Sequence, residues 1–297
     1  KLPAVTSLGT SAFKGCTKLN NVSLGGGLKQ ISESAFENCT ALEMLGLPSS
    51  LERIEAYAFK GSGLASLALP SSINYIDFSA FNGCANFAEL TVSDPESGYY
   101  IDEETGWLML SEGEDENKTV TLLMVLGSVQ GEIVVPEGIT AIGKSAFENC
   151  AALKRITLPK SITKLEALTF SGCASLAEIT LPDGLKALGE KVFSGCAALK
   201  SVKIPAEVTV IPAEAFSGCV SLESITIPKS VSHINEHAFD DCTALKKVDY
   251  LGSDTDWSQV TKETGNNVLD NAEKSFTRTD HEHKYTDTVI PPTCTER

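Results

Sequence analysis

The chain repeats one arrangement of apolar and polar positions about every 23 residues. A phenylalanine stands three residues before a cysteine, and aliphatic residues follow the cysteine three, six and eight positions later, as Leu153, Ile156 and Leu158 follow Cys150. Apolar residues two apart predict a short strand with one buried face, and the proline that usually follows ends it because it has no N–H. The spacing of three around Phe and Cys predicts a single helical or 3₁₀ turn.

The phenylalanines and cysteines recur in register, so we expect them to point into one interior. Cys39 follows Cys16 by 23 residues, Ser62 occupies the next equivalent position, and the period returns after one long gap. The predicted core includes the following side chains: Phe36, Phe147, Phe170, Phe193, Phe216, Phe239, Cys150, Cys173, Cys196, Cys219 and Cys242.

A single 23-residue unit is too small to fold alone. Ordering its backbone costs about 1–2 kcal/mol per residue, whereas each buried side chain returns about 1.5–3 kcal/mol. The units must therefore stack. Repeats of this length with an L-x-x-L-x-L pattern indicate an α/β leucine-rich-repeat solenoid, with a parallel β-sheet on one face and short helical or 3₁₀ turns.

The unit also resembles a known family, the BspA-type leucine-rich repeats. Residues 139–159 match its pattern I-x-x-I-x-x-x-A-F-x-x-C-x-x-L-x-x-I-x-L-P, and the resemblance extends over roughly residues 1–250. It implies a surface-exposed or secreted protein of the kind common in anaerobic gut and oral bacteria and in some protozoan parasites, with adhesion to host components as the inferred role.

The repeat is interrupted once. At about 94–131 the Phe and Cys positions lapse, and the segments 107–110 and 120–126 are strand-like on either side of an acidic turn, which predicts a hairpin. Because the pattern resumes at once, we expect the stack to continue through this insertion. The sequence does not indicate the role of the hairpin.

After the last repeat the composition changes. Residues 251–276, with Trp257, Val260 and Leu269 as apolar anchors, are interpreted as a C-terminal cap over the open last coil. The polar stretch 277–297 is interpreted as a tail that begins a further, truncated module.

Charge and hydropathy exclude two classes of partner. A net charge of −15, from 39 acidic and 24 basic side chains, repels a phosphate backbone, so nucleic acid is not an expected partner. No apolar run approaches the roughly 20 residues that span a bilayer, so no membrane insertion is expected in this stretch. The first residues already fit a repeat, and a targeting segment is expected upstream of them.

One segment matches a catalytic motif. Residues 233–237, His-Ile-Asn-Glu-His, fit the H-x-x-E-H string of one zinc-peptidase group, which needs both histidines on one helical face. Ile234, however, is a core position of the repeat, and Gln30 and Ser34 hold the two histidine positions in another unit. With no defensible Ser/His/Asp set and no phosphate loop, we expect no catalytic residues, no metal, no cofactor and no enzyme activity.

The cysteines are interpreted as buried free thiols. Equivalent side chains on successive coils point in parallel, whereas a disulfide needs β-carbons that face each other. Cys294 lies outside the repeat, in the same tail as His281 and His283, and a metal or disulfide site completed by other residues stays open there.

A ligand would meet the strand residues that flank each central aliphatic, because these point away from the core. Toward the start they are small and polar, as at Asn21 and Ser66. The predicted binding residues are the following: Arg155, Thr157, Glu178, Thr180, Lys203, Thr226 and Lys247. A polar face that merely suits a β-sheet is the plainer interpretation of any one of them.

The expected function is a non-enzymatic, cell-surface or secreted binding or adhesion protein. Its expected partner is a protein or glycan on the surface of a host or neighbouring cell, recognised by the extended solenoid face. A structural spacer that displays another module is the alternative, and a zinc peptidase using the H-x-x-E-H string is the third choice.

Overall fold

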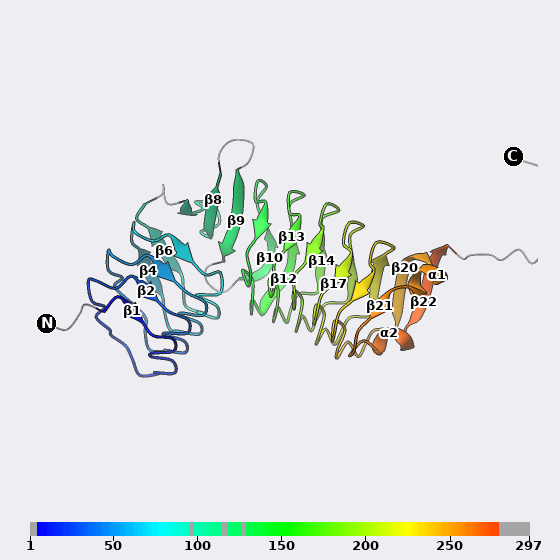
Figure 1. Cartoon of the computed structure of the whole chain (residues 1–297), viewed down its shortest axis with the longest axis horizontal. Helices are drawn as coiled ribbons and strands as arrows, with labels where there is room; N and C mark the ends of the chain where they lie inside the picture. The colour runs from blue at the N-terminus through cyan, green and yellow to red at the C-terminus, as the bar shows by residue number, and fades with distance from the viewer. Residues whose placement is uncertain (1–4, 95–97, 114–117, 126–128, 279–297) are drawn as a thin grey trace, which may run out of the picture.

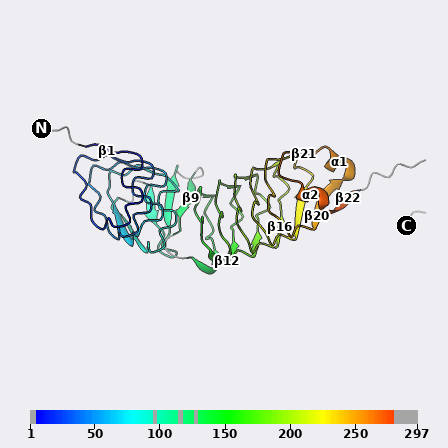
Figure 2. The ribbon, with the colours of Figure 1, turned by 90° about the horizontal axis from the view of Figure 1, so that it is seen from below.

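The polypeptide winds into an elongated solenoid of stacked coils, with β1 (Ser7–Leu8) and β22 (Glu273–Arg278) at opposite ends (Figures 1 and 2). The computed structural model describes residues 5–94, 98–113, 118–125 and 129–278. Each regular coil has three sides: a strand of a broad parallel sheet, a turn that carries Phe and Cys, and a two-residue strand of a second parallel sheet.

The broad sheet contains the longer strands, in three hydrogen-bonded groups. Successive strands pair in parallel and in register, so that Arg155 lies opposite Glu178 and Val202 opposite Ile225, 23 residues further on in each case. The groups are β4 (Ser66–Leu69) and β6 (Glu89–Val92); β10 (Gln130–Val134), β12 (Ala152–Thr157) and β14 (Glu178–Thr180); and β16 (Ser201–Lys203), β18 (Ser224–Pro228), β20 (Lys247–Ser253) and β22 (Glu273–Arg278).

The second sheet consists mostly of two-residue strands, which the repeat pattern did not predict as strands. They are β1 (Ser7–Leu8), β2 (Gln30–Ile31), β3 (Arg53–Ile54), β5 (Tyr75–Ile76), β11 (Ala141–Ile142), β13 (Lys164–Leu165), β15 (Ala187–Leu188), β17 (Val210–Ile211), β19 (His233–Ile234) and β21 (Thr261–Lys262). In all of them except β1 and β21, at the two ends, one residue is buried and its neighbour is at least partly exposed.

The third side is a column of stacked phenylalanines and thiols. The Phe170 and Phe193 rings are 5.6 Å apart and nearly parallel, and the Phe193 and Phe216 rings are 5.4 Å apart. Each buried thiol donates a hydrogen bond to the phenylalanine carbonyl of the previous coil, as Cys196 Sγ does to Phe170 at 3.2 Å. Cysteine therefore serves here as a small apolar residue with one weak donor.

The turns around Phe and Cys are not continuous helices. Cys196 N–H bonds to the Phe193 carbonyl, three residues back, as a 3₁₀ turn requires. Lys191 and Gly195 on either side have φ angles of 57° and 73° and interrupt the right-handed path. Within the described residues the helices are α1 (Asp254–Ser258) and α2 (Val268–Asn271), both after the last repeat.

The predicted core residues lie inside the stack, with one difference. The six phenylalanines have 0% exposure, and Cys173, Cys196, Cys219 and Cys242 are buried. Cys150, in the first coil after the interruption, is only half-buried, and it lines a concavity together with Cys84 and Val125. The eight cysteines of the described residues are free thiols.

The interruption is a hairpin placed within the stack, between the two series of coils (Figure 1). β8 (Leu108–Glu112) pairs antiparallel with β9 (Thr119–Met124) and with β7 (Tyr99–Ile101), and β9 pairs in parallel with β11. The C-terminal part of the second sheet thereby continues into the insertion as far as β7, which does not pair with β5 within the described residues. Part of the predicted hairpin, at 114–117 and Leu126, lies outside the described residues.

The hairpin divides the apolar interior into two clusters. Leu108 and Leu123 belong to the N-terminal core, whereas Met109 and Leu122, their neighbours in sequence, belong to the C-terminal core. Because successive residues of a strand point to opposite faces, one hairpin covers the end of each core.

Parallel pairing continues past the last repeat. β21 pairs with β19 and β22 pairs with β20, so residues 251–276 add strands to both sheets as well as covering the last coil. Trp257 is 5.1 Å from the Tyr250 ring, and Leu269 is completely buried. The tail from 279 to 297, with His281, His283 and Cys294, lies outside the described residues.

Candidate binding face

The exposed residues of the broad sheet form two parallel columns. Side chains alternate along each strand, so the buried Ile156, Ile179 and Val202 have exposed residues on either side. Register then aligns equivalent residues of neighbouring strands. The first column is Glu132, Arg155, Glu178, Ser201, Ser224, Lys247 and Glu273, and the second is Val134, Thr157, Thr180, Lys203, Thr226, Asp249 and Ser275.

All seven predicted binding residues lie in these two columns. Six of them are exposed and Thr226 is half-buried. Lys247 lies at the far end of the face, beside the half-buried Asp249. The structure thus brings together residues that are separated by up to four repeats in sequence. The columns contain no aromatic side chain among the described residues.

Arg155 forms ion pairs with its two neighbours in the first column. The Arg155 guanidinium is 2.5 Å from a Glu178 carboxylate oxygen and 3.9 Å from one of Glu132. All three side chains are about half exposed or more, and such a surface pair contributes only about 0–1 kcal/mol. A partner carboxylate can therefore replace Glu178 at little cost.

A second polar cluster lies at the end of the face. Lys247 Nζ is 2.8 Å from Asp249 Oδ1 and 3.0 Å from Oδ2, and the Ser275 hydroxyl donates a hydrogen bond to Oδ1. The hydrogen bond from Lys247 and that from Ser275 lower the pKa of Asp249. Lys203, between the two clusters, has no ion pair within the described residues.

The N-terminal part of the face is shallower and less charged. Met44 is 72% exposed, and it lies beside Gly46, Ser66 and Ala68 in a concavity of about 410 Å³. Small residues at these positions leave the backbone close to the surface.

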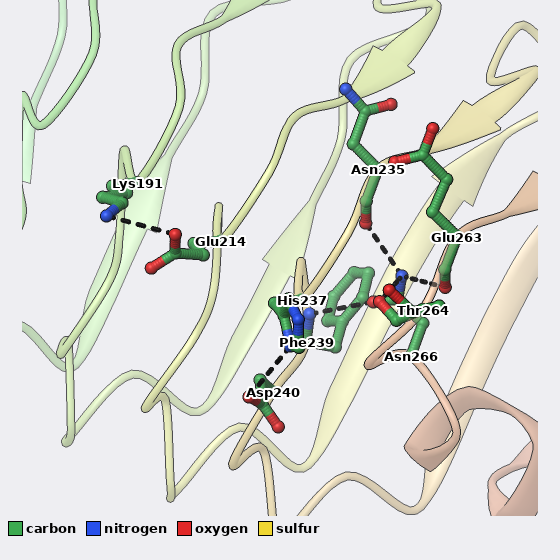
Figure 3. Close-up of polar contacts among 9 residues, drawn as sticks. All are labelled: Lys191, Glu214, Asn235, His237, Phe239, Asp240, Glu263, Thr264 and Asn266. Atoms are coloured by element: carbon green, nitrogen blue, oxygen red, sulfur yellow. Dashed lines mark hydrogen bonds and ion pairs between the residues drawn. The ribbon is translucent and has the colours of Figure 1, made fainter.

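The H-x-x-E-H segment does not form the helix that the zinc-peptidase motif requires. His233 lies in the short strand β19, and His237 follows in a turn with a φ of 54°. His237 Nδ1 contacts Asp240 at 3.2 Å, and Asn266 of the next coil lies close by (Figure 3). Within the described part of the chain, no three His, Cys, Asp or Glu side chains gather as metal ligands.

A groove beside β6 was missed from the sequence. It is lined by β6, β7 and the acidic loop after β7, and includes Tyr100, Glu103 and Glu104. In the sequence, only the consecutive tyrosines and the acidic run within the interruption could have indicated this groove.

A parallel solenoid with 23 residues in each regular coil defines the class of protein, a leucine-rich-repeat protein. The sequence matches the family model for the BspA type leucine rich repeat region, with six copies, over residues 1–104 and 128–246. The chain therefore belongs to the BspA-type leucine-rich-repeat family. Among curated proteins, no sequence matches this chain significantly.

Two solved structures have similar folds. A leucine rich cell surface protein from Faecalibacterium prausnitzii is 28% identical with a TM-score of 0.75, and the match covers 89% of this chain and 74% of that one. A leucine-rich repeat protein from Eubacterium ventriosum is 22% identical with a TM-score of 0.68, covering 82% and 69% of the two chains. No comparison indicates a catalytic family.

The described residues include no helix with the length and apolar character needed to cross a bilayer.

Proposed function

We propose that this protein is a non-enzymatic, extracellular binding protein that adheres to a partner through its broad sheet. The observation that carries the proposal is the register of β12 with β14, and of β16 with β18 and β20, which aligns the predicted binding residues in the two columns. The F. prausnitzii protein with the same fold is described as a cell surface protein, which supports an extracellular location for this chain.

The chemistry of the columns favours a protein partner over a glycan. Threonine hydroxyls and exposed Arg and Lys side chains suit hydrogen bonds and ion pairs, whereas sugar sites usually offer an aromatic ring, which these columns lack. The partner would be carried on the surface of a host or neighbouring cell.

Binding to immobilised host matrix proteins and mucin glycans tests this function. We expect saturable binding to at least one matrix protein. Thr180→Arg with Thr226→Arg places two bulky side chains on the second column and should weaken that binding by about tenfold or more, or about 1.4 kcal/mol.

The matched control is Thr163→Arg with Thr209→Arg. Both of these threonines are exposed, but they lie in the connections between strands rather than on the broad sheet. This control should bind like the wild type. Absence of saturable binding by the wild type would favour the structural spacer, and equal weakening by both double variants would contradict the use of this face.

A further inference from the structure

The groove beside β6 lies where the broad sheet is interrupted. It has a volume of about 750 Å³ and is bordered by β6 on one side and by β7 with its following loop on the other. β6 lies beside the hairpin (Figure 1), and β7 pairs with β8 of the hairpin. We call this region, from Phe81 to Phe147, the seam between the two series of coils. The lining comes from segments that do not follow the repeat pattern.

Each of the two strands that border the groove is paired on one side only. Within the described residues β6 pairs with β4 alone, and β7 pairs with β8 alone. The N–H groups of Glu89 and Ser93 donate to the carbonyl groups of Ala65, which directly precedes β4, and of Leu69 in β4. Because alternate residues of a parallel strand direct their backbone groups to opposite sides, Val92 directs its N–H away from β4, toward the groove.

The floor of the groove is apolar. Leu90 and Tyr99 are buried, and the side chains of Val92, Tyr100 and Ile101 are half-buried. A side chain of an added strand would therefore find apolar surface to cover. A four-residue extended segment spans roughly 13 Å, comparable with the length of β6.

The rim of the groove is acidic. Glu103 and Glu104 are exposed and form no ion pair within the described residues, and no basic side chain lines the groove. Asp102 accepts hydrogen bonds from the N–H and hydroxyl of Thr105 at 2.9 and 2.6 Å, which fixes the loop that carries them. The rim thus presents negative charge at a defined position.

We propose that this groove binds an extended, basic segment of a partner polypeptide by strand addition. Main-chain hydrogen bonds to the free edge of β6 supply affinity, alternate apolar side chains cover Val92 and Tyr100, and lysine or arginine side chains meet Glu103 and Glu104. This site is separate from the two columns of the broad sheet and does not depend on their proposed role. A second copy of this chain is disfavoured as occupant because its net charge is −15.

The test uses the whole chain and an acetylated heptapeptide of alternating lysine and valine, with binding measured by calorimetry or fluorescence anisotropy. The matched probe carries N-methyl groups on alternate amides, so it keeps its charge and side chains but loses backbone donors. We expect the first peptide to bind with a dissociation constant below about 1 mM and the second at least tenfold more weakly. Equal binding of the two peptides, or no binding of the first, would overturn the proposal.

Variants of the groove locate the site. Val92→Pro removes the N–H that faces the groove and should weaken binding at least tenfold, whereas Val92→Ile keeps this N–H and should change affinity far less than Val92→Pro does. Thermal unfolding of Val92→Pro reports whether β6 is retained. If β6 is lost in this variant, the charge variants of Glu103 and Glu104 test the site instead.

Glu103→Lys with Glu104→Lys should weaken peptide binding by at least about fivefold, and added salt should narrow the difference from the wild type. Glu137→Lys with Glu190→Lys makes the same charge change at two exposed positions away from the groove and should reduce binding less than twofold. Equal effects of the two charge variants would indicate adsorption to an acidic surface and reject the site. Concentration-dependent dimerisation abolished by Val92→Pro would also reject it, because the edge would then pair with a second copy.

Discussion

In the regular stack, between Phe147 and Phe239, each coil repeats the contacts that the preceding coil makes. In the seam, between Phe81 and Phe147, few contacts are repeated. In the regular stack every ring lies 5.3–5.6 Å from the next. In the seam Phe81 stacks on Phe87 of its own coil, and Trp107 meets Phe147 edge-on at 6.0 Å.

Hydrogen bonds differ between the two regions in the same way. In the regular stack, backbone groups and thiols repeat their partners every 23 residues. In the seam the Tyr99 hydroxyl accepts the Ile76 N–H at 3.2 Å, and Asn82 donates to Glu148 at 2.5 Å. In the seam, hydrogen bonds from single side chains take the place of the repeated bonds between coils. We therefore expect the loss of any one of these side chains to lower the stability measurably.

The largest expected effect is the loss of one ring from the regular stack. Phe193→Ala should lower the free energy of unfolding by about 3–5 kcal/mol, because it leaves a cavity between two fully buried rings. Urea unfolding followed by circular dichroism measures it. Val220→Ala, at an exposed position, is the control and should change stability by less than about 0.5 kcal/mol. A loss below about 1 kcal/mol for Phe193→Ala would mean that the stack closes over the gap.

Two neighbouring leucines of β9 test whether the hairpin separates two cores. Leu122→Ala and Leu123→Ala should each cost about 2–5 kcal/mol, since both side chains are buried. Hydrogen exchange should accelerate mainly in residues 139–200 for the first variant and in 64–92 for the second, because contacts in a solenoid are made between neighbours. Acceleration of the same half by both variants would show that the seam does not divide the stack.

Loss of a single seam hydrogen bond should have a smaller effect. Tyr99→Phe removes the acceptor for the buried Ile76 N–H and should cost about 1–3 kcal/mol in urea unfolding. Tyr57→Phe is the matched control, because the Tyr57 hydroxyl has no hydrogen bond among the described contacts, and it should cost less than about 0.5 kcal/mol. Equal losses in the two variants would assign the effect to the ring environment and not to the hydrogen bond.

The smallest expected effect concerns one thiol of the regular stack. Cys196→Ser should change stability at pH 7 by within about 1 kcal/mol, since the hydroxyl can donate to the same carbonyl and Ser62 occupies this position naturally. A loss of several kcal/mol would show that the position requires sulfur.

The pH dependence of stability has a definite sign. Burial raises the pKa of Cys242 and of Cys150 to about 12, and it raises that of Cys196 well above the usual thiol range. Unfolded thiols ionise near pH 8.5. The contribution of the neutral thiols is therefore complete below that pH and is lost progressively between about pH 8.5 and 12. The melting temperature should fall less steeply over this range in Cys196→Ser than in the wild type, and equal slopes would contradict the assignment.

The repeat made the regular stack predictable, but some local features were not. A core set of phenylalanines follows directly from the period. The second sheet did not follow, because strands of two residues are too short for alternation to be visible. The broken turns did not follow either, since Lys191 and His237 hold left-handed conformations at positions where glycine would have been the signal.

The columns of the broad face were predictable for the same reason as the core. Once Ile156 and Ile179 are buried, Arg155 and Thr157 must point outward. The groove was not predictable, because it depends on where β7 lies relative to β6. That placement is decided by the pairing of β7 with β8, outside the repeat.

By itself the sequence determined the stack, its period, its interior and the residues that its broad sheet exposes. It could do so because a periodic chain makes the same short-range contacts in every unit, so one coil specifies the next. Only the tertiary structure decided how the hairpin divides the interior and which strand edges remain free beside it. Those features depend on contacts made once, between segments that no period relates.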